Sequence, residues 1–249
     1  MKHYKSVSRF PGKTGQYYYT KFFEHYNIPA IYTPVGLDDG VKDFILTEKQ
    51  QGTAGISVSM PFKTEVINYL DELDISAVEY GTVNTITINN GISCGYNADL
   101  AGVEYTASMI DTGDRVIILG SGAMANMYVA YLNAHGYGNI KQVARAAGYN
   151  NWQQRFDPAD VVINCTGLGT SSSASPFDSA PMHQDVRLVI DLAIKDNDFA
   201  KQCVKRQVKY VNGTVFYKQQ FLRQFEIYTG VKPDAELFDK FERQLNEKI

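Results

Sequence analysis

The most constraining stretch of the sequence is an apolar tetrapeptide at residues 116–119, Val-Ile-Ile-Leu, which runs directly into a glycine-rich loop. An uninterrupted aliphatic run predicts a strand buried on both faces, as in a parallel sheet. The loop fits the pattern G-x-G-x-x-A and precedes a helix predicted over residues 126–135. Its glycines would permit a tight turn and the close approach of a pyrophosphate, to which the helix start supplies N–H donors. The candidate cofactor ligands in this loop are Gly120, Ser121, Gly122, Ala123, Met124 and Ala125.

Arg145, at the end of the next predicted strand (residues 140–145), bears on which dinucleotide would bind. A ribose with a free 2′-hydroxyl usually meets an acidic residue here, whereas an arginine suits a 2′-phosphate through paired hydrogen bonds. We therefore predict NADP. The alternative is that Arg145 is an ordinary surface residue, and no second basic residue follows before Arg155. NAD therefore stays possible.

Three further apolar strands are predicted over residues 160–166, 188–191 and 209–211, with a helix over 199–206. The first of them ends in a loop containing Gly167 and Gly169, which could lie along the nicotinamide half of a dinucleotide or be a plain loop. Asn212 and Gly213 end this series. Strands and helices in this order predict a Rossmann-type domain.

The N-terminal part of the chain predicts a second α/β domain. Strands over residues 6–8, 30–35 and 55–59 alternate with two helices, which predicts a mostly parallel sheet with helices on its faces. A hairpin follows over residues 82–96, with its tight turn at Asn89, Asn90 and Gly91.

Lys63 and Asp99 each occupy a predicted loop-to-helix junction of this N-terminal sheet. Pro61 suits a first helical position, so Lys63 would lie in a first helical turn, where a cation is disfavoured. Asp99 would follow an N-cap at Asn97, where an acid is favoured and therefore also fits a purely structural role. A lone lysine at a helix start is usually just solvated. The two together, at the ends of strands of one sheet, indicate a shared crevice.

Composition excludes several classes of function. The chain has 249 residues and a formal net charge of −3, without a basic cluster, so neither nucleic acid nor an anionic membrane is an expected partner. No apolar stretch approaches the ~20 residues of a membrane span, and no signal peptide is recognisable. Cys94, Cys165 and Cys203 lack ligand spacing, which predicts reduced thiols in a cytoplasmic protein and no metal site.

In combination these motifs resemble the shikimate dehydrogenase family, in particular its divergent shikimate dehydrogenase-like subgroup. The resemblance rests on motifs that occur in the family's order across nearly the whole chain: Ser-Val-Ser-Met-Pro-Phe-Lys at 57–63, Thr-Val-Asn-Thr-Ile at 82–86, Gly-Tyr-Asn-Ala-Asp at 95–99, the glycine loop at 120–125, Asn-Cys-Thr-Gly-Leu-Gly at 164–169, and Asn212-Gly213 followed by Gln220.

The resemblance implies a substrate domain over residues 1–101, completed by C-terminal helices at 214–249, and a Rossmann NADP domain over 102–213, with a cleft between them. It implies reversible oxidation of shikimate, or of a close cyclic hydroxy acid such as quinate, to 3-dehydroshikimate in the shikimate pathway of aromatic amino acid biosynthesis. Lys63 and Asp99 would be the catalytic pair. The implied substrate-binding residues are Lys13, Gly15, Ser57, Ser59, Asn84 and Gln220, and the implied further cofactor ligands are Thr166, Gly167 and Gly213.

Three positions depart from the family pattern and predict altered substrate or cofactor choice. Lys13 and Gly15 replace a Ser-x-Ser pair that grips the substrate carboxylate. Ile194 stands where the family often has a tyrosine. Residues 144–146, Ala-Arg-Ala, replace an Asn-Arg-Thr clamp on the adenosine phosphate.

Two alternatives to this enzyme stay open. One is a non-catalytic small-molecule binder of the same fold, and the other is a scaffold module. The expected partners are a small-molecule substrate and, for a homodimer, a second copy of the chain; a monomer is equally compatible with the sequence.

Overall fold

The structure is a computed structural model that describes residues 1–145, 151–170, 173–178, 180–195 and 197–247. It divides into two compact units. The first consists of Met1–Leu100 together with Gln220–Ile249, and the second is Ala101–Gln219. The first unit is therefore assembled from both ends of the chain, and each unit is described by itself below.

The first unit contains a six-stranded sheet in the order β2-β1-β3-β5-β6-β4. Its strands are β1 (Lys2–Ser8), β2 (Ala30–Gly36), β3 (Gly55–Val58), β4 (Glu72–Leu73), β5 (Thr85–Asn89) and β6 (Ile92–Tyr96). The pairs β1/β2, β1/β3 and β4/β6 are parallel, while β5 runs antiparallel to both β3 and β6. The predicted hairpin turn is confirmed: Asn90 and Gly91 both have positive φ, as a two-residue turn of this type requires.

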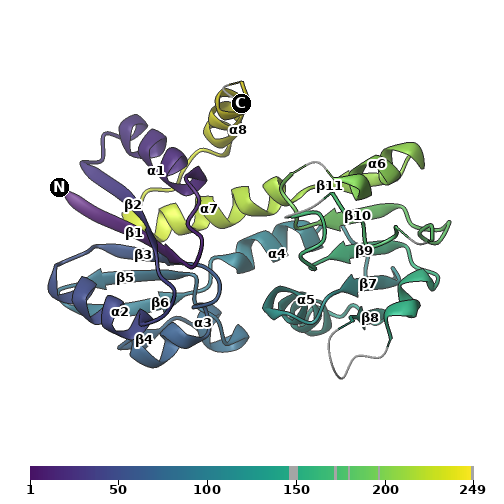
Figure 1. Ribbon diagram of the computed structural model, residues 1–249, viewed down its shortest axis with the longest axis horizontal. Coiled ribbons are helices and arrows are strands. Elements are labelled where there is room, and N and C mark those ends of the chain that lie inside the picture. Colours follow the sequence, from purple (N-terminus) through teal and green to yellow (C-terminus); the bar gives the residue numbers. More distant parts are fainter. Residues whose placement is uncertain (146–150, 171–172, 179, 196, 248–249) are drawn as a thin grey trace. The chain divides into compact units, whose positions relative to one another are not determined.

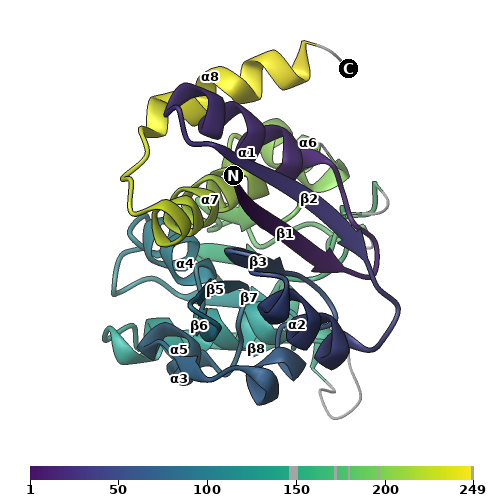
Figure 2. The same ribbon diagram turned by 90° about the vertical axis from the view of Figure 1, so that its left-hand side faces the viewer.

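Helices at both ends of the chain form the aromatic core of the first unit. They are α1 (Thr14–His25), the later part of α7 (Gly213–Thr229) and α8 (Ala235–Asn246). The other helices of this unit, α2 (Val41–Gln50) and α3 (Ile75–Tyr80), contribute Val41, Ile45 and Ala77 to another core cluster. Figure 2 shows α1 and α8 side by side, and the rings of Tyr18 and Phe238 stack there with centroids 4.3 Å apart. Phe22 of α1 packs against Phe225 of α7 in a tilted arrangement, with ring centroids 5.3 Å apart. The aromatic residues of α1 thus face a core built from the C-terminal end of the chain.

The segment after β3 differs from its prediction. No α-helix begins at Pro61; residues 60–64 form a turn, and a short 3₁₀ helix, η1 (Glu65–Tyr69), follows it. The Met60–Pro61 peptide bond is cis. Thr64, Val66 and Ile67 are β-branched residues with low helix propensity, and one buried turn suffices to place Phe62 and Val66 in the core. Lys63 therefore lies in a turn, and the prediction that it occupies a first helical turn is wrong.

The second unit is built on a five-stranded sheet, labelled in Figure 1, in the order β11-β10-β9-β7-β8. Its strands are β7 (Val116–Leu119), β8 (Ile140–Val143), β9 (Val161–Asn164), β10 (Leu188–Asp191) and β11 (Lys209–Val211), and all their pairings are parallel. Its helices are most of α4 (Asp99–Ala107), α5 (Ala123–Ala134), the 3₁₀ turn η2 (Trp152–Phe156) and α6 (Asp198–Lys205). The α/β fold class with parallel-rich sheets is confirmed.

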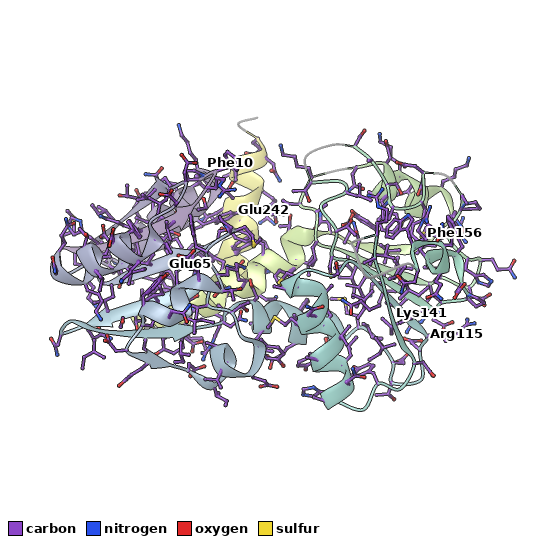
Figure 3. The ribbon with its side chains drawn as sticks, turned by 60° about the horizontal axis from the view of Figure 1, so that its bottom comes forward. Phe10, Glu65, Arg115, Lys141, Phe156 and Glu242 are labelled. Atoms are coloured by element: carbon purple, nitrogen blue, oxygen red, sulfur yellow. The ribbon has the colours of Figure 1, made fainter. Side chains whose placement is uncertain are left out.

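The chain order reverses between β7 and β9, which makes the carboxyl ends of these strands a topological switch point. The opposite, amino-terminal edge is held by ion pairs. Arg115, labelled in Figure 3, contacts Asp160 at 2.8 Å and Asp185 at 2.9 Å. The Arg115 guanidinium lowers the pKa of Asp160 to about 2. In open α/β sheets, ligands bind at the other, carboxyl-terminal edge.

Within the described residues, no helix combines the length and the apolar character that crossing a membrane requires.

Candidate active site

The carboxyl ends of β1, β2 and β3 meet at one edge of the first unit's sheet. Leu37, after β2, donates its backbone N–H to the carbonyl of Ser8 at 3.0 Å, and Arg9 donates to the carbonyl of Met60 at 3.2 Å. The segment after β3, which carries Lys63, is thereby held against the end of β1. Loops at the carboxyl ends of neighbouring parallel strands are where ligand sites form in α/β proteins.

Lys63 and Asp99 form an ion pair at this edge. Lys63 Nζ lies 2.6 Å from Asp99 Oδ2, and the two side chains are 18% and 5% exposed. Asp99 opens α4, where the helix field favours an acid, and its N–H bonds to the Asn97 side-chain oxygen at 3.1 Å. The structure thus brings together the two residues proposed as the catalytic pair. The charge of Lys63 is balanced by its direct contact with Asp99, and Lys63 is not in a helix whose field could act on it.

Two hydrogen bonds hold Asn84 close to the Lys63–Asp99 pair. Its side-chain oxygen accepts from the N–H of Ala98, next to Asp99, at 2.8 Å. The preceding residue, Val83, donates its N–H to the carbonyl of Lys63 at 2.8 Å. Asn84 is 1% exposed, and its Nδ2 is the one buried side-chain polar atom of the described residues that lacks a hydrogen-bond partner. Leaving such a donor unpaired costs about 1–3 kcal/mol, so it calls for a functional explanation.

Ser57 lies behind this cluster, in a network that the sequence did not reveal. Its hydroxyl donates to Gln224 Oε1 at 2.9 Å and contacts the Tyr228 hydroxyl at 2.9 Å. Tyr32 also bonds to Ser57, and burial raises the pKa of Tyr32 to about 12. Burial likewise raises the pKa of Tyr228, so these phenols are hydrogen-bonding groups and not acids near neutral pH.

The remaining substrate candidates are not part of this cluster. Ser59 and Lys13 are exposed, Gly15 lies inside α1, and Gln220 is partly exposed on α7. No hydrogen bond within the described part of the chain joins their side chains to Lys63, Asn84 or Asp99. The buried glutamine of α7 is Gln224, which is 3% exposed. It lies one helical turn beyond Gln220 and between Phe221, Phe225 and Tyr228 in the sequence, and an amide surrounded by aromatic residues is the signal that could have identified it.

In the second unit, the glycine loop forms a tight link between β7 and α5. Gly120 has a φ of +123°, a conformation that favours glycine, and a Cβ there would lie 3.1 Å from the carbonyl oxygen of Cys165. Helix α5 begins at Ala123, three residues earlier than predicted, so Ala123, Met124 and Ala125 are helical. A Cβ at Gly122 would meet nothing within 4 Å, and no side chain caps the helix start.

This helix start fits a dinucleotide pyrophosphate. The first helical bond runs from Asn126 N–H to the Gly122 carbonyl at 3.1 Å, so the N–H groups of the first turn are left for an anion. Gln142 steadies the loop by donating to the Gly120 carbonyl at 3.0 Å and to Asn126 Oδ1 at 2.8 Å. The residues present therefore suit the cofactor class that the sequence predicted.

Arg145 lies immediately beyond β8. Its guanidinium carbon is 5.0 Å from the ring centre of Trp152, and among described residues it makes no hydrogen bond or ion pair. Arg155, in contrast, is buried and donates to the carbonyls of Pro176 and Trp152, so it is not a second free basic group. Burial, and next the nearby Arg145, lower the pKa of Arg155. Ala146, the last residue of the altered clamp, lies outside the described residues.

The other cofactor candidates follow the carboxyl ends of β9 and β11. Thr166 donates its hydroxyl to Asn164 Oδ1 at 2.6 Å and accepts from the N–H of Leu168, while Gly167 is exposed with no neighbour at its Cβ position. Gly213 is required by close packing, because a Cβ there would lie 2.4 Å from the carbonyl oxygen of Leu192. Ile194, at the position of the missing tyrosine, is 51% exposed.

Comparison with known proteins agrees with these features. The family model described as the shikimate dehydrogenase substrate-binding domain matches residues 16–86. A protein from Streptococcus sanguinis named shikimate dehydrogenase (NADP(+)) is 30% identical over 205 residues, which cover 71% of this chain and 72% of that protein. A protein of the same name from Thermoplasma acidophilum is 27% identical over 248 residues, covering 94% and 92%.

A solved structure described as a shikimate 5-dehydrogenase-like protein superimposes with a TM-score of 0.85, at 25% identity and with 96% of each chain covered. The relatives and the fold agree over almost the whole length of the sequence. The chain therefore belongs to the shikimate dehydrogenase family.

Proposed function

We propose that the protein catalyses the NADP-linked, reversible oxidation of shikimate to 3-dehydroshikimate. The observation that carries this proposal is the Lys63–Asp99 pair, held at 2.6 Å beside the buried amide of Asn84. The open start of α5 supports the cofactor, and relatives named as NADP-dependent shikimate dehydrogenases support the substrate. Residues 1–101 with 214–249 would bind the substrate, and residues 102–213 the cofactor.

The chemistry assigns separate tasks to Lys63 and Asp99. When bound, NADP would supply hydride transfer to and from the carbon that carries the reacting hydroxyl. The hydroxyl must also lose its proton: Lys63 Nζ, as the neutral amine, accepts it during oxidation, and the resulting ammonium gives it back during reduction. Asp99 orients Nζ through its hydrogen bond, and the lysine stabilises charge that develops on the oxygen.

The other polar groups of the site hold the ring. Asn84 and Ser59 are proposed to bind ring hydroxyls, together with Gln220 of α7. Ser57 takes part through the buried network behind Asn84. Lys13, which is exposed at the start of α1, would meet the carboxylate by charge, with Gly15 of the same first helical turn beside it. A single mobile ammonium fixes a carboxylate less tightly than two hydroxyls would, which favours a broader substrate range that includes quinate.

The first test measures turnover and the role of the ion pair. Reduced-nicotinamide absorbance is followed with shikimate or quinate and with NADP or NAD. Lys63→Ala and Asp99→Asn should each lower kcat by about 10²–10⁴-fold, because proton transfer to a positioned group contributes rate enhancements of that order. Lys49→Ala is the matched control, since Lys49 and Asp71 form another lysine–aspartate pair of the same unit, and it should retain full activity.

Two results would contradict the proposal. Activity that survives Lys63→Ala would remove the assigned proton transfer. Calorimetric binding of shikimate without any turnover, whichever cofactor is supplied, would identify a small-molecule binder instead of a dehydrogenase.

We also infer that the enzyme works in the cytoplasm. Its three cysteines are unpaired, as is usual in a reducing compartment.

A further inference from the structure

A chain of hydrogen bonds connects the aromatic core of the first unit to Asn84, and its direction can be deduced. Gln224 Nε2 lies 3.0 Å from the backbone oxygen of Asn84 and 2.7 Å from the Thr85 hydroxyl. A backbone oxygen can only accept, so the group of Gln224 that faces it must be the NH₂ group. The other end of the amide, Oε1, accepts from the hydroxyls of Tyr19 at 2.8 Å and Ser57 at 2.9 Å. All four hydrogen bonds of Gln224 are thereby accounted for.

The direction then passes through Thr85 to the side chain of Asn84. The Thr85 hydroxyl accepts from Gln224, which leaves its own hydrogen for Asn84 Oδ1, 2.7 Å away. The backbone N–H of Ala98 also points at this oxygen, and a backbone N–H can only donate. Two independent donors therefore fix which end of the Asn84 amide is oxygen. The free end is Nδ2, the buried donor without a partner.

We propose that Thr85 and Gln224 are positioning residues that fix the Asn84 amide so that it presents only its NH₂ group to the substrate. This inference rests on the proposed function. It assigns no contact with substrate to Thr85 or Gln224, which are 0% and 3% exposed. The Asn84 NH₂ group would then recognise an oxygen with a lone pair, such as a ring hydroxyl acting as acceptor. A protonated amine at the same ring position has no lone pair and would be rejected.

The central experiment compares Thr85→Val with Thr85→Ser. Valine keeps the branched shape but removes the hydroxyl, whereas serine keeps the hydroxyl. We expect Thr85→Val to raise the KM for shikimate about tenfold, the order expected when a hydrogen bond to a binding group is lost, with the KM for NADP unchanged. Thr85→Ser should stay within about twofold of the unchanged protein. Equal losses for both variants would overturn the proposal, because they would report packing and not the hydroxyl.

A double-mutant cycle with Asn84→Ala separates positioning from general stability. If Thr85 acts through Asn84, adding Thr85→Val to Asn84→Ala should cause no further loss of kcat/KM for shikimate. Effects that multiply would overturn the inference. Gln224→Met provides a second entry to the same network and should also raise the KM for shikimate, while Gln219→Met, on the same helix, is the matched control and should not.

The network itself is tested without substrate by urea unfolding. Thr85→Val and Gln224→Met remove groups that bond to each other, so their effects on unfolding should be smaller in combination than in sum. Additive effects would overturn the inference. If the unchanged protein does not turn over shikimate, the proposed function fails, and this role fails with it. If the unchanged protein is active but the effects of Thr85→Val and Gln224→Met on unfolding are additive, only the positioning role fails.

Discussion

At the residue scale, the site depends on contacts between side chains that are close in space and far apart in the sequence. Lys63 and Asp99 are 36 residues apart and share one short ion pair. Lys63 is not in a helix, so the field of a helix start does not act on it as predicted. The reason for its placement is the turn over residues 60–64, which presents its side chain to the first turn of α4.

Arg145 is the residue that should decide between NADP and NAD. Its guanidinium lies against Trp152 and has no acidic partner among described residues, so it remains available for a phosphate. We predict that Arg145→Ala raises the KM for NADP about tenfold or more, while the KM for NAD changes less than twofold. Steady-state kinetics with both cofactors provide the measurement.

Lys141→Ala is the control for this prediction. Lys141 lies on β8, the strand that precedes Arg145, and is already paired with Asp157. Its loss should therefore change the KM for NADP and for NAD equally little. Equal effects of Arg145→Ala on NADP and NAD would show that the arginine is an ordinary surface residue.

At the scale of single elements, the start of α5 serves binding at the expense of helix stability. No side chain caps it, although an acidic or hydroxyl side chain would stabilise a helix there. Helix α4, in contrast, opens with Asp99 and has Asn97 bonded to its first turn. The absence of a cap at α5 agrees with a role for its N–H groups in binding a phosphate of the cofactor.

Ala123→Asp should therefore separate stability from cofactor binding. A carboxylate in the first turn of α5 should stabilise the helix by about 0.3–1 kcal/mol, because its negative charge is attracted to the positive end of the helix dipole. The same charge should repel a pyrophosphate and weaken both NADP and NAD by about tenfold or more. Thermal unfolding and titration calorimetry measure the two effects.

Ala130→Asp is the control on the same helix. Ala130 is exposed in the second half of α5, where a negative charge gains nothing from the dipole and lies away from the loop. It should leave cofactor affinity unchanged. An Ala123→Asp protein that binds both cofactors normally would show that the pyrophosphate does not sit at this helix start.

At the scale of the whole molecule, the first unit is closed by the C-terminal helices. Phe225 of α7 is fully buried and packs against Phe22 and Phe23 of α1. The ends of the chain therefore fold together, although more than 100 residues of the second unit separate them in sequence.

Phe225→Ala should lower the free energy of unfolding by about 3–5 kcal/mol, because it removes a large buried ring and leaves a cavity. Phe10, labelled in Figure 3, is 86% exposed, so Phe10→Ala should change stability by less than about 0.5 kcal/mol. Urea unfolding followed by circular dichroism compares the two. Similar losses would contradict the assignment of α7 to the core of the first unit.

Local pattern in the sequence predicted most of the elements. Strands β7, β10 and β11 lie at their predicted residues, because apolar runs and turn residues act within a few positions of the chain. The hairpin turn at Asn90 and Gly91 was predictable for the same reason. The segment after β3 was not, since Pro61 suggested a helix start while the β-branched residues that follow disfavour one.

The sequence by itself determined the order of strands and helices, the glycine loop and the presence of a lysine and an aspartate at strand ends. Only the tertiary structure decided which glutamine of α7 is buried and which end of the Asn84 amide is free. Gln220 and Gln224 are one helical turn apart, and their environments differ because Tyr19, Ser57 and Thr85 come to Gln224 from other elements. Hydrogen bonds across 139 to 205 positions of sequence leave no local pattern, so they arise only when the chain is folded.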